Sequence, residues 1–289
     1  MKFFAYRVDQ AAGLAIETGG EQKGLDESDP HYPGALDQLL SRGALALSQA
    51  ADTIAAHGTP VDLTHVTILP PVMPSKIICV GLNYRDHAEE TGLELPDSPT
   101  VFSRWASSIV GADQPLVRPA VSGRLDFEGE LAVIIGTRGR HIPRERALDH
   151  VGGYSCFNDG SVRDYQLRTP QWTLGKNFDQ SGSLGPALVT PDALPPGAAG
   201  LAIRTLLNGE VMQASTTDQL LFDVGTLIAL ISEVLTLEPG DVIATGTPSG
   251  VGFTRQPPVW MKAGDQCEVE IEGIGCLRNP VRDEILRSA

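Results

Sequence analysis

The 289-residue sequence has no run of about 20 apolar residues, no cluster of basic residues and only four cysteines. Without such an apolar run it offers no membrane-spanning helix, and Lys2 and Arg7 leave no room for the apolar region of a signal peptide. The formal net charge of -14 opposes binding to nucleic acid or anionic membranes, because phosphate groups would be repelled. The cysteines lack C-x-x-C spacing. We therefore expect reduced core thiols and a cytoplasmic protein.

Turn-forming residues are plentiful, with 31 glycines and 21 prolines. The length allows one large domain with or without a small one. The proline-rich segment 69–74 interrupts regular structure, so we place a boundary there and predict a small N-terminal domain over residues 1–71 and a larger domain over 72–289. Within the first domain we expect a strand at 3–8 and a helical stretch at 35–57.

The second part contains many short strand patterns and one long helical pattern. The helical pattern spans 217–235, where apolar residues recur with a period of three to four. Strand patterns occur at 76–81, 127–135, 241–245 and 267–272. This distribution predicts an α+β protein whose larger domain is mainly β.

Acidic residues stand out on one predicted strand. Glu128 and Glu130 are two residues apart, so their side chains point to the same face, and Asp159 ends a further buried-strand pattern. Two carboxylates on an inward-looking face need a cation or a wet cleft. Oxygen ligands favour Mg²⁺, Mn²⁺ or Ca²⁺ over zinc. The alternative is a solvated strand edge with Asp159 as a turn former.

Two further segments carry groups suited to acid–base and electrostatic chemistry. His87 and Glu90 share a face if their segment is helical, which would make a general-base pair, although a surface histidine beside two acids is the plainer interpretation. Lys176 is a lone cation among apolar and glycine residues; it either holds a carboxylate or extends to solvent from a strand. The glycine-rich loop 246–252 lacks a nucleotide-binding ending, but its donors suit a carboxylate.

Together these segments resemble the fumarylacetoacetate hydrolase family from about residue 76 to 281. The resemblance rests on the segments VGLNYRDH at 80–87, FEGEL at 127–131, Asn158-Asp159 with Arg163-Asp164, WTLGK at 172–176, LNGE at 207–210 and GDVIATGTPSGVG at 240–252. It implies a rolled mixed β-sheet catalytic domain, preceded by a small N-terminal α/β domain, and a homodimer.

The resemblance also implies roles for individual residues. Glu128, Glu130 and Asp159 match the family's divalent-metal ligands, His87 and Glu90 match a catalytic dyad on a lid, and Lys176 matches the active-site lysine. Gln166, Thr247 and Arg85 match substrate-binding positions.

Two positions depart from the family pattern. Leu82 stands where relatives often have a cation, and Arg104 stands where many have lysine. A cation at this position would bind a substrate carboxylate, and Leu82 does not. The relatives therefore do not establish which acid is the substrate.

These features lead us to expect a metal-dependent hydrolase that cleaves a C–C bond in an acylpyruvate-like or diketo acid, with Mg²⁺ as the metal, or Mn²⁺ or Ca²⁺. His87, oriented by Glu90, would activate water and Lys176 would hold negative charge. The alternative is a lyase or isomerase using the same metal-enolate site: an oxaloacetate-type decarboxylase, a keto-enol tautomerase or an oxo-dioate isomerase. A non-enzymatic metal- or carboxylate-binding protein is a further alternative.

Overall fold

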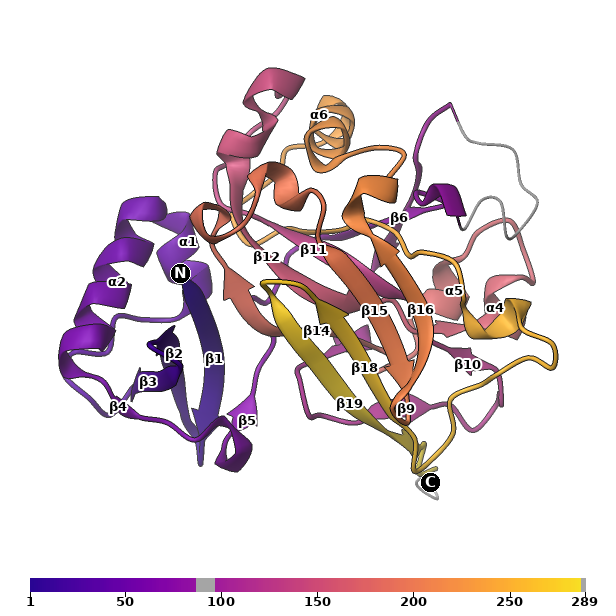
Figure 1. The fold of residues 1–289 in the computed structure, drawn as a ribbon, viewed down its shortest axis with the longest axis horizontal. Coiled ribbons are helices and arrows are strands. Elements are labelled where there is room, and N and C mark those ends of the chain that lie inside the picture. Colours follow the sequence, from indigo (N-terminus) through magenta and orange to yellow (C-terminus); the bar gives the residue numbers. More distant parts are fainter. Residues whose placement is uncertain (87–96, 287–289) are drawn as a thin grey trace.

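The computed structural model describes residues 1–86 and 97–286. Within these residues, twelve strands form one mixed sheet, and a second sheet of five strands packs beside it (Figure 1). The large sheet runs in the order β4-β3-β2-β1-β14-β12-β11-β17-β6-β7, with β5 added to β1 and β8 added to β14. The second sheet has the order β16-β15-β18-β19-β9, and β10 and β13 form a two-stranded ribbon.

The strands have the following bounds: β1 Lys2–Val8, β2 Ala11–Thr18, β3 Glu21–Asp26, β4 Thr59–Pro60, β5 Thr67–Ile68, β6 Ile77–Gly81, β7 Thr100–Arg104, β8 Ile109–Val110, β9 Leu116–Arg118, β10 Leu125–Asp126, β11 Gly129–Ile135, β12 Val151–Asn158, β13 Ser161–Val162, β14 Gly182–Val189, β15 Ala202–Leu207, β16 Glu210–Thr216, β17 Val242–Ala244, β18 Gln266–Ile271 and β19 Gly275–Asp283. The α-helices are α1 Leu36–Ser41, α2 Ala44–His57, α4 Arg163–Gln166, α5 Thr173–Lys176 and α6 Val224–Val234. The 3-10 helices are η1 Leu63–His65, η2 Ala106–Ser108, η3 Arg144–His150, η4 Pro191–Ala193, η5 Pro196–Ala198, η6 Thr217–Gln219 and η7 Gly252–Thr254. The α+β, mainly β class expected from the sequence is confirmed.

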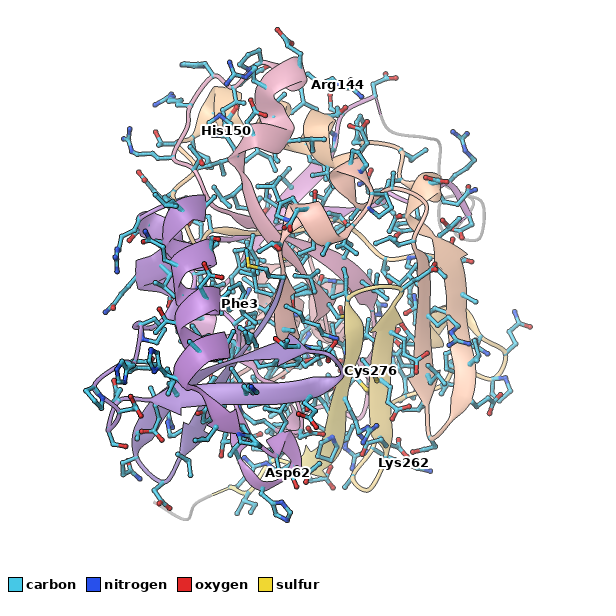
Figure 2. The ribbon with its side chains drawn as sticks, turned by 60° about the vertical axis from the view of Figure 1, so that its left-hand side comes forward. Phe3, Asp62, Arg144, His150, Lys262 and Cys276 are labelled. Atoms are coloured by element: carbon cyan, nitrogen blue, oxygen red, sulfur yellow. The ribbon has the colours of Figure 1, made fainter. Side chains whose placement is uncertain are left out.

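The N-terminal strands continue the large sheet. Strand β1 pairs antiparallel with β14, where Phe3 faces Leu188 across the ladder. Helix α2 covers these strands, and Phe3 lies buried beside it (Figure 2). The sheet therefore crosses the boundary that we placed at residue 71, and the division into two domains stays a prediction.

The helices differ in detail from the sequence pattern. The helical stretch expected at 35–57 is two helices, because Gly43 adopts a left-handed φ of 88° between them. Helix α6 begins only after Asp223, whose side chain accepts a hydrogen bond from the Thr226 N–H and caps it. At 11 residues α6 is the longest helix among the described residues after 71, although it is shorter than the pattern at 217–235 predicted.

Strand β11 lies at the centre of the molecule, and all seven of its residues are buried. Leu131, Val133 and Ile135 pack in one core cluster with residues of the second sheet and α6, such as Ile203 and Ile228. Ala132 and Ile134 pack in another cluster with the N-terminal helices. The strand is thus covered on both faces, and its N-terminal end carries the acidic residues.

The cysteines are free thiols, as expected. Three are fully buried (Cys79, Cys156 and Cys267), while Cys276 on β19 is half-buried (Figure 2). None of the helices in the described residues has the length and apolar character needed to cross a bilayer.

Candidate active site

Strand pairing brings the three predicted carboxylates together. Strands β11 and β12 are antiparallel with Gly129 opposite Asn158, so Asp159 emerges beside Glu128, and its N–H donates to the Glu128 carbonyl at 2.9 Å. One oxygen from each of Glu128, Glu130 and Asp159 lies within 4.8 Å of the others. These residues are 6%, 2% and 0% exposed. The alternative of a solvated strand edge is therefore wrong.

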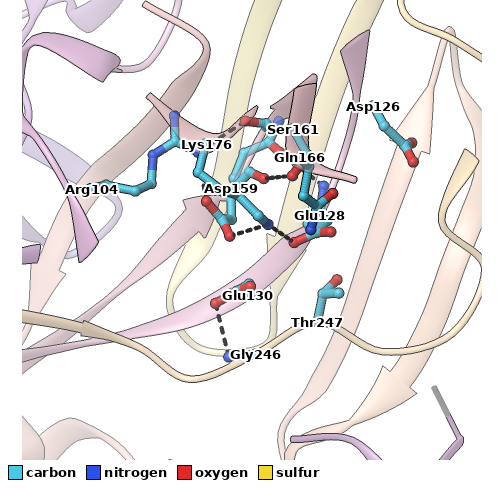
Figure 3. A network of polar contacts seen from close by, with 12 residues as sticks. Arg104, Asp126, Glu128, Glu130, Asp159, Ser161, Gln166, Lys176, Gly246 and Thr247 are labelled. Atoms are coloured by element: carbon cyan, nitrogen blue, oxygen red, sulfur yellow. Dashed lines mark hydrogen bonds and ion pairs between the residues drawn. The ribbon is translucent and has the colours of Figure 1, made fainter. Parts of the chain in front are cut away.

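Lys176, at the end of α5, bridges two of these carboxylates (Figure 3). Its ammonium lies 2.6 Å from Glu128 Oε2 and 2.6 Å from Asp159 Oδ2. Burial alone would lower the pKa of Lys176, but the charges of Asp159 and Glu128 outweigh it and the pKa is raised. The lysine is buried and charged, and it does not extend to solvent.

Arg104 holds the other side of Asp159. From the end of β7 it donates to Asp159 Oδ1 at 2.5 Å and to the carbonyl of Gly160 at 2.9 Å. Its remaining N–H groups donate to Ser108 and to Ser181 Oγ. Because its polar atoms are satisfied in this way, we assign Arg104 to holding Asp159 in place.

Arg163, at the start of α4, approaches Glu128 from a third direction. Its Nη1 lies 2.6 Å from Glu128 Oε1, and its Nε donates to Asp126 at 2.8 Å. Its Nη2 is buried and has no hydrogen-bond partner among the described residues. The guanidinium lies 4.4 Å from the Phe253 ring centroid and lines the same cavity as the three carboxylates. A buried guanidinium N–H without a protein partner, on a residue that lines a cavity, is a candidate donor to a ligand oxygen.

Asp126 fixes Arg163 to the loop that closes this side of the cavity. Its carboxylate is fully buried and accepts from Arg163 and from the backbone N–H groups of Phe127, Gly252 and Phe253 at 2.8–3.0 Å. Burial raises the pKa of Asp126, although Arg163 opposes that shift. Asp126 thus sets where Arg163 and Phe253 stand.

Glu130 differs from its two neighbours, because no cation of the described residues forms an ion pair with it. Its Oε2 accepts from the Gly246 N–H at 2.8 Å. Burial and the charges of Asp159 and Glu128 raise its pKa well above the ordinary value. A buried, cation-poor carboxylate beside two others is a donor set that fits a divalent cation, which would offset the charge.

The cavity is lined by these charged groups on one side and by apolar residues on the other: Val80, Gly81, Leu82, Phe102, Leu167, Trp172 and Phe253. Of the residues matched to substrate binding, Gln166 and Thr247 line the cavity, whereas Arg85 is exposed and is not among its lining residues. Leu82 lines it with a left-handed φ of 57°. His87 and Glu90 lie outside the described residues.

Sequence reasoning assigned no role to Arg163, Asp126 or Gln213, a buried glutamine that contacts Thr247. Arg163 had a signal, since it stands four residues after Asp159 in one of the matched segments. Asp126 and Gln213 had none, because their roles depend on contacts with distant segments.

Residues 76–282 match the family model for the fumarylacetoacetate (FAA) hydrolase C-terminal domain. The chain belongs to the fumarylacetoacetate hydrolase family and is an enzyme of that family, whose members depend on a divalent metal.

Among curated relatives, the mitochondrial oxaloacetate tautomerase Fahd2a of Rattus norvegicus is 44% identical over 93% of this chain and 86% of its own. A fumarylacetoacetate hydrolase from Exiguobacterium antarcticum is a similar solved structure, with a TM-score of 0.87, 40% identity and coverage of 98% of this chain and 100% of its own. A 5-carboxymethyl-2-hydroxymuconate delta-isomerase from Mycobacterium smegmatis gives a TM-score of 0.77, 34% identity and coverage of 99% and 100%. The rat relative is named as mitochondrial, so the cytoplasmic location stays a prediction.

Proposed function

We propose that this protein is a divalent-metal-dependent tautomerase of a small 2-oxo dicarboxylic acid of the oxaloacetate type. This is one of the activities that we kept as an alternative to hydrolysis. Similarity to proteins named oxaloacetate tautomerase and isomerase supports it better than it supports C–C bond cleavage.

The unpartnered Nη2 of Arg163 is the observation that carries the substrate class. Arg163 lines the cavity that also holds the three carboxylates proposed to bind the metal, and its Nη2 has no hydrogen-bond partner among the described residues. The other two cations nearby, Lys176 and Arg104, already contact protein oxygens. A ligand with one carboxylate beside its 2-oxo group and a second at the far end would satisfy both the metal and Arg163.

We propose that Glu128, Glu130 and Asp159 bind the cation, with Mg²⁺ as the first metal to test. When bound, the cation supplies positive charge that polarises the 2-oxo group and acidifies the neighbouring C–H. Lys176 and Arg163 keep Glu128 oriented and add positive charge at the same end of the cavity. We propose that His87, oriented by Glu90, moves the proton between carbon and solvent, a role that rests on the sequence.

Hydrolysis of a diketo acid remains a second candidate, because a similar solved structure is named fumarylacetoacetate hydrolase. Hydrolysis needs a positioned water, whereas tautomerisation needs only proton transfer at the carbon next to the carbonyl. Decarboxylation of oxaloacetate is a third candidate reaction, because it too develops negative charge next to the 2-oxo group. The three reactions give different products.

The experiment supplies the enol form of oxaloacetate to the purified protein and follows its ultraviolet absorbance, with Mg²⁺, Mn²⁺ or Ca²⁺ or with EDTA. We expect metal-dependent loss of the enol signal, with oxaloacetate recovered intact by mass spectrometry. Release of carbon dioxide would identify a decarboxylase instead. Two shorter acids formed from an acylpyruvate, without acceleration of the enol decay, would restore the hydrolase interpretation.

A further inference from the structure

Gln213, on β16 of the second sheet, is 1% exposed and joins three segments of the site. Its Oε1 accepts from the N–H of Gly129, the residue between Glu128 and Glu130, at 3.0 Å. Its Nε2 donates to the Pro248 carbonyl and to Thr247 Oγ1, both at 2.8 Å. Gln213 itself does not line the cavity, whereas Thr247 does.

The backbone determines which way the Gln213 amide points. The Gly129 N–H can only donate, so the atom facing it is the amide oxygen. The Pro248 carbonyl can only accept, so the atom facing it is the amide nitrogen. The second hydrogen of that nitrogen is directed at Thr247 Oγ1. Thr247 is therefore forced to accept from Gln213.

The hydroxyl hydrogen of Thr247 is also committed. Thr247 Oγ1 donates to the Gly129 carbonyl at 3.0 Å, and a carbonyl can only accept. A threonine hydroxyl has one hydrogen and two lone pairs, so one lone pair remains. Thr247 lies beside Glu128 and Glu130 in the cavity (Figure 3). A ligand oxygen that meets this hydroxyl therefore meets an acceptor and no free donor.

We propose that Gln213 is a positioning residue that, together with the Gly129 carbonyl, fixes Thr247 as a hydrogen-bond acceptor, and that the site thereby selects a ligand oxygen that carries a proton. This deepens and rests on the proposed function, because the keto and enol forms of a 2-oxo acid differ in the place of one proton. The keto form carries it on carbon and presents a bare carbonyl oxygen. The enol form carries it on oxygen and pairs with Thr247.

The test compares two ligands that differ in one hydrogen-bond donor. Malate carries a hydroxyl at C2, and 2-fluorosuccinate of the same configuration carries fluorine there, which is similar in size and donates nothing. Affinities for the Mg²⁺-loaded protein are measured by calorimetry for the wild type, Thr247→Val, Thr247→Ser and Gln213→Met. The quantity compared is the preference for malate over 2-fluorosuccinate, which cancels any general loss of affinity.

We expect Thr247→Val to lower this preference roughly tenfold, the effect of one neutral hydrogen bond in a buried site. Thr247→Ser should keep it, and Gln213→Met should lower it several-fold, because Thr247 Oγ1 and Gly129 then lose the amide that holds them in place. A preference that is unchanged in Thr247→Val overturns the inference, as does equal weakening of both ligands in Gln213→Met or no binding of malate to the wild type. If Gln213→Met fails to fold, the two Thr247 variants decide the question.

This measurement requires no turnover, so it separates the two proposals. If the wild type does not interconvert the tautomers of oxaloacetate but the preference behaves as expected, the proposed function is wrong and the acceptor role of Thr247 stands. If turnover is found and the preference does not depend on Thr247, the reverse holds.

Discussion

Arg104 donates a 2.5 Å hydrogen bond to Asp159, and both side chains are completely shielded from solvent. The two residues are 55 positions apart and come from β7 and the end of β12. Burying two charges costs solvation free energy, which their attraction offsets. Removing one partner leaves the other charge buried and unpaired, which costs far more. Asp159 is consequently held in place by protein groups before any metal binds.

Removing this buried cation should destabilise the protein. Arg104→Met leaves Asp159 with Lys176 as its remaining cation, so we expect the free energy of unfolding to fall by about 3–5 kcal/mol. Arg104→Lys keeps the charge but loses the planar set of donors, and its loss should be smaller. Urea denaturation measures both. Arg138→Met, at an exposed ion pair with Glu238, is the control and should cost less than about 1 kcal/mol. Equal midpoints for Arg104→Met and this control would contradict the assignment.

The metal site should be visible in thermal unfolding. Glu130 is a buried carboxylate whose hydrogen-bond partner is a backbone N–H, so Glu130→Gln removes an unfavourable charge from the metal-free protein. We expect this variant to melt at or above the wild-type temperature in EDTA. Added Mg²⁺ or Mn²⁺ should stabilise the wild type by about 2.7 kcal/mol at a hundred times the dissociation constant. It should not stabilise Glu130→Gln.

The control for this comparison is Glu21→Gln, which changes an exposed carboxylate in β3. It should respond to metal as the wild type does. A wild-type melting temperature that is indifferent to every divalent cation tested would remove the basis for a site at Glu130.

Arg163 should discriminate between dicarboxylic and monocarboxylic substrates. Arg163→Lys preserves a positive charge near Glu128 but has no equivalent of the unpartnered Nη2. We expect kcat/KM for oxaloacetate to fall roughly 10- to 100-fold, mainly through KM, while that for a monocarboxylic 2-oxo acid such as 2-oxobutyrate changes little. Steady-state kinetics with both acids gives the ratio. A parallel fall for both acids would show that Arg163 acts only by orienting Glu128.

Two variants should distinguish the role of the proposed proton-transfer residue from that of the proposed metal ligands. His87→Ala should lower kcat by about 10²- to 10⁴-fold while metal affinity is retained. Glu128→Ala should lose both, because Glu128 is one of the three clustered carboxylates. Activity assays combined with metal titration test the pair. Near-normal rates in both variants would rule out the assignment of both residues.

Part of the fold could be predicted because its signals are local. The strand at 3–8, the strand at 76–81 and a helix within 217–235 follow from period and turn residues, and the structure has them as β1, β6 and α6, with α6 starting later than predicted. The break at Gly43 was not predicted, since a glycine inside an alanine-rich pattern is compatible with a continuous helix. The joining of β1 to β14 was not predicted either, because those strands are far apart in the sequence.

The sequence by itself determined which donor groups the site contains. The alternation of side chains along a strand puts Glu128 and Glu130 on one face, and three carboxylates form a set of hard oxygen ligands wherever they meet. Only the tertiary structure decided how those groups are held. The register of β11 and β12 places Asp159 beside Glu128. Packing brings Arg104 against Asp159, and Gln213 donates a hydrogen bond to the Thr247 hydroxyl. Such contacts depend on strand order and register, which the whole chain determines. Residue type and hydrophobic period, by contrast, can be read from each short segment alone.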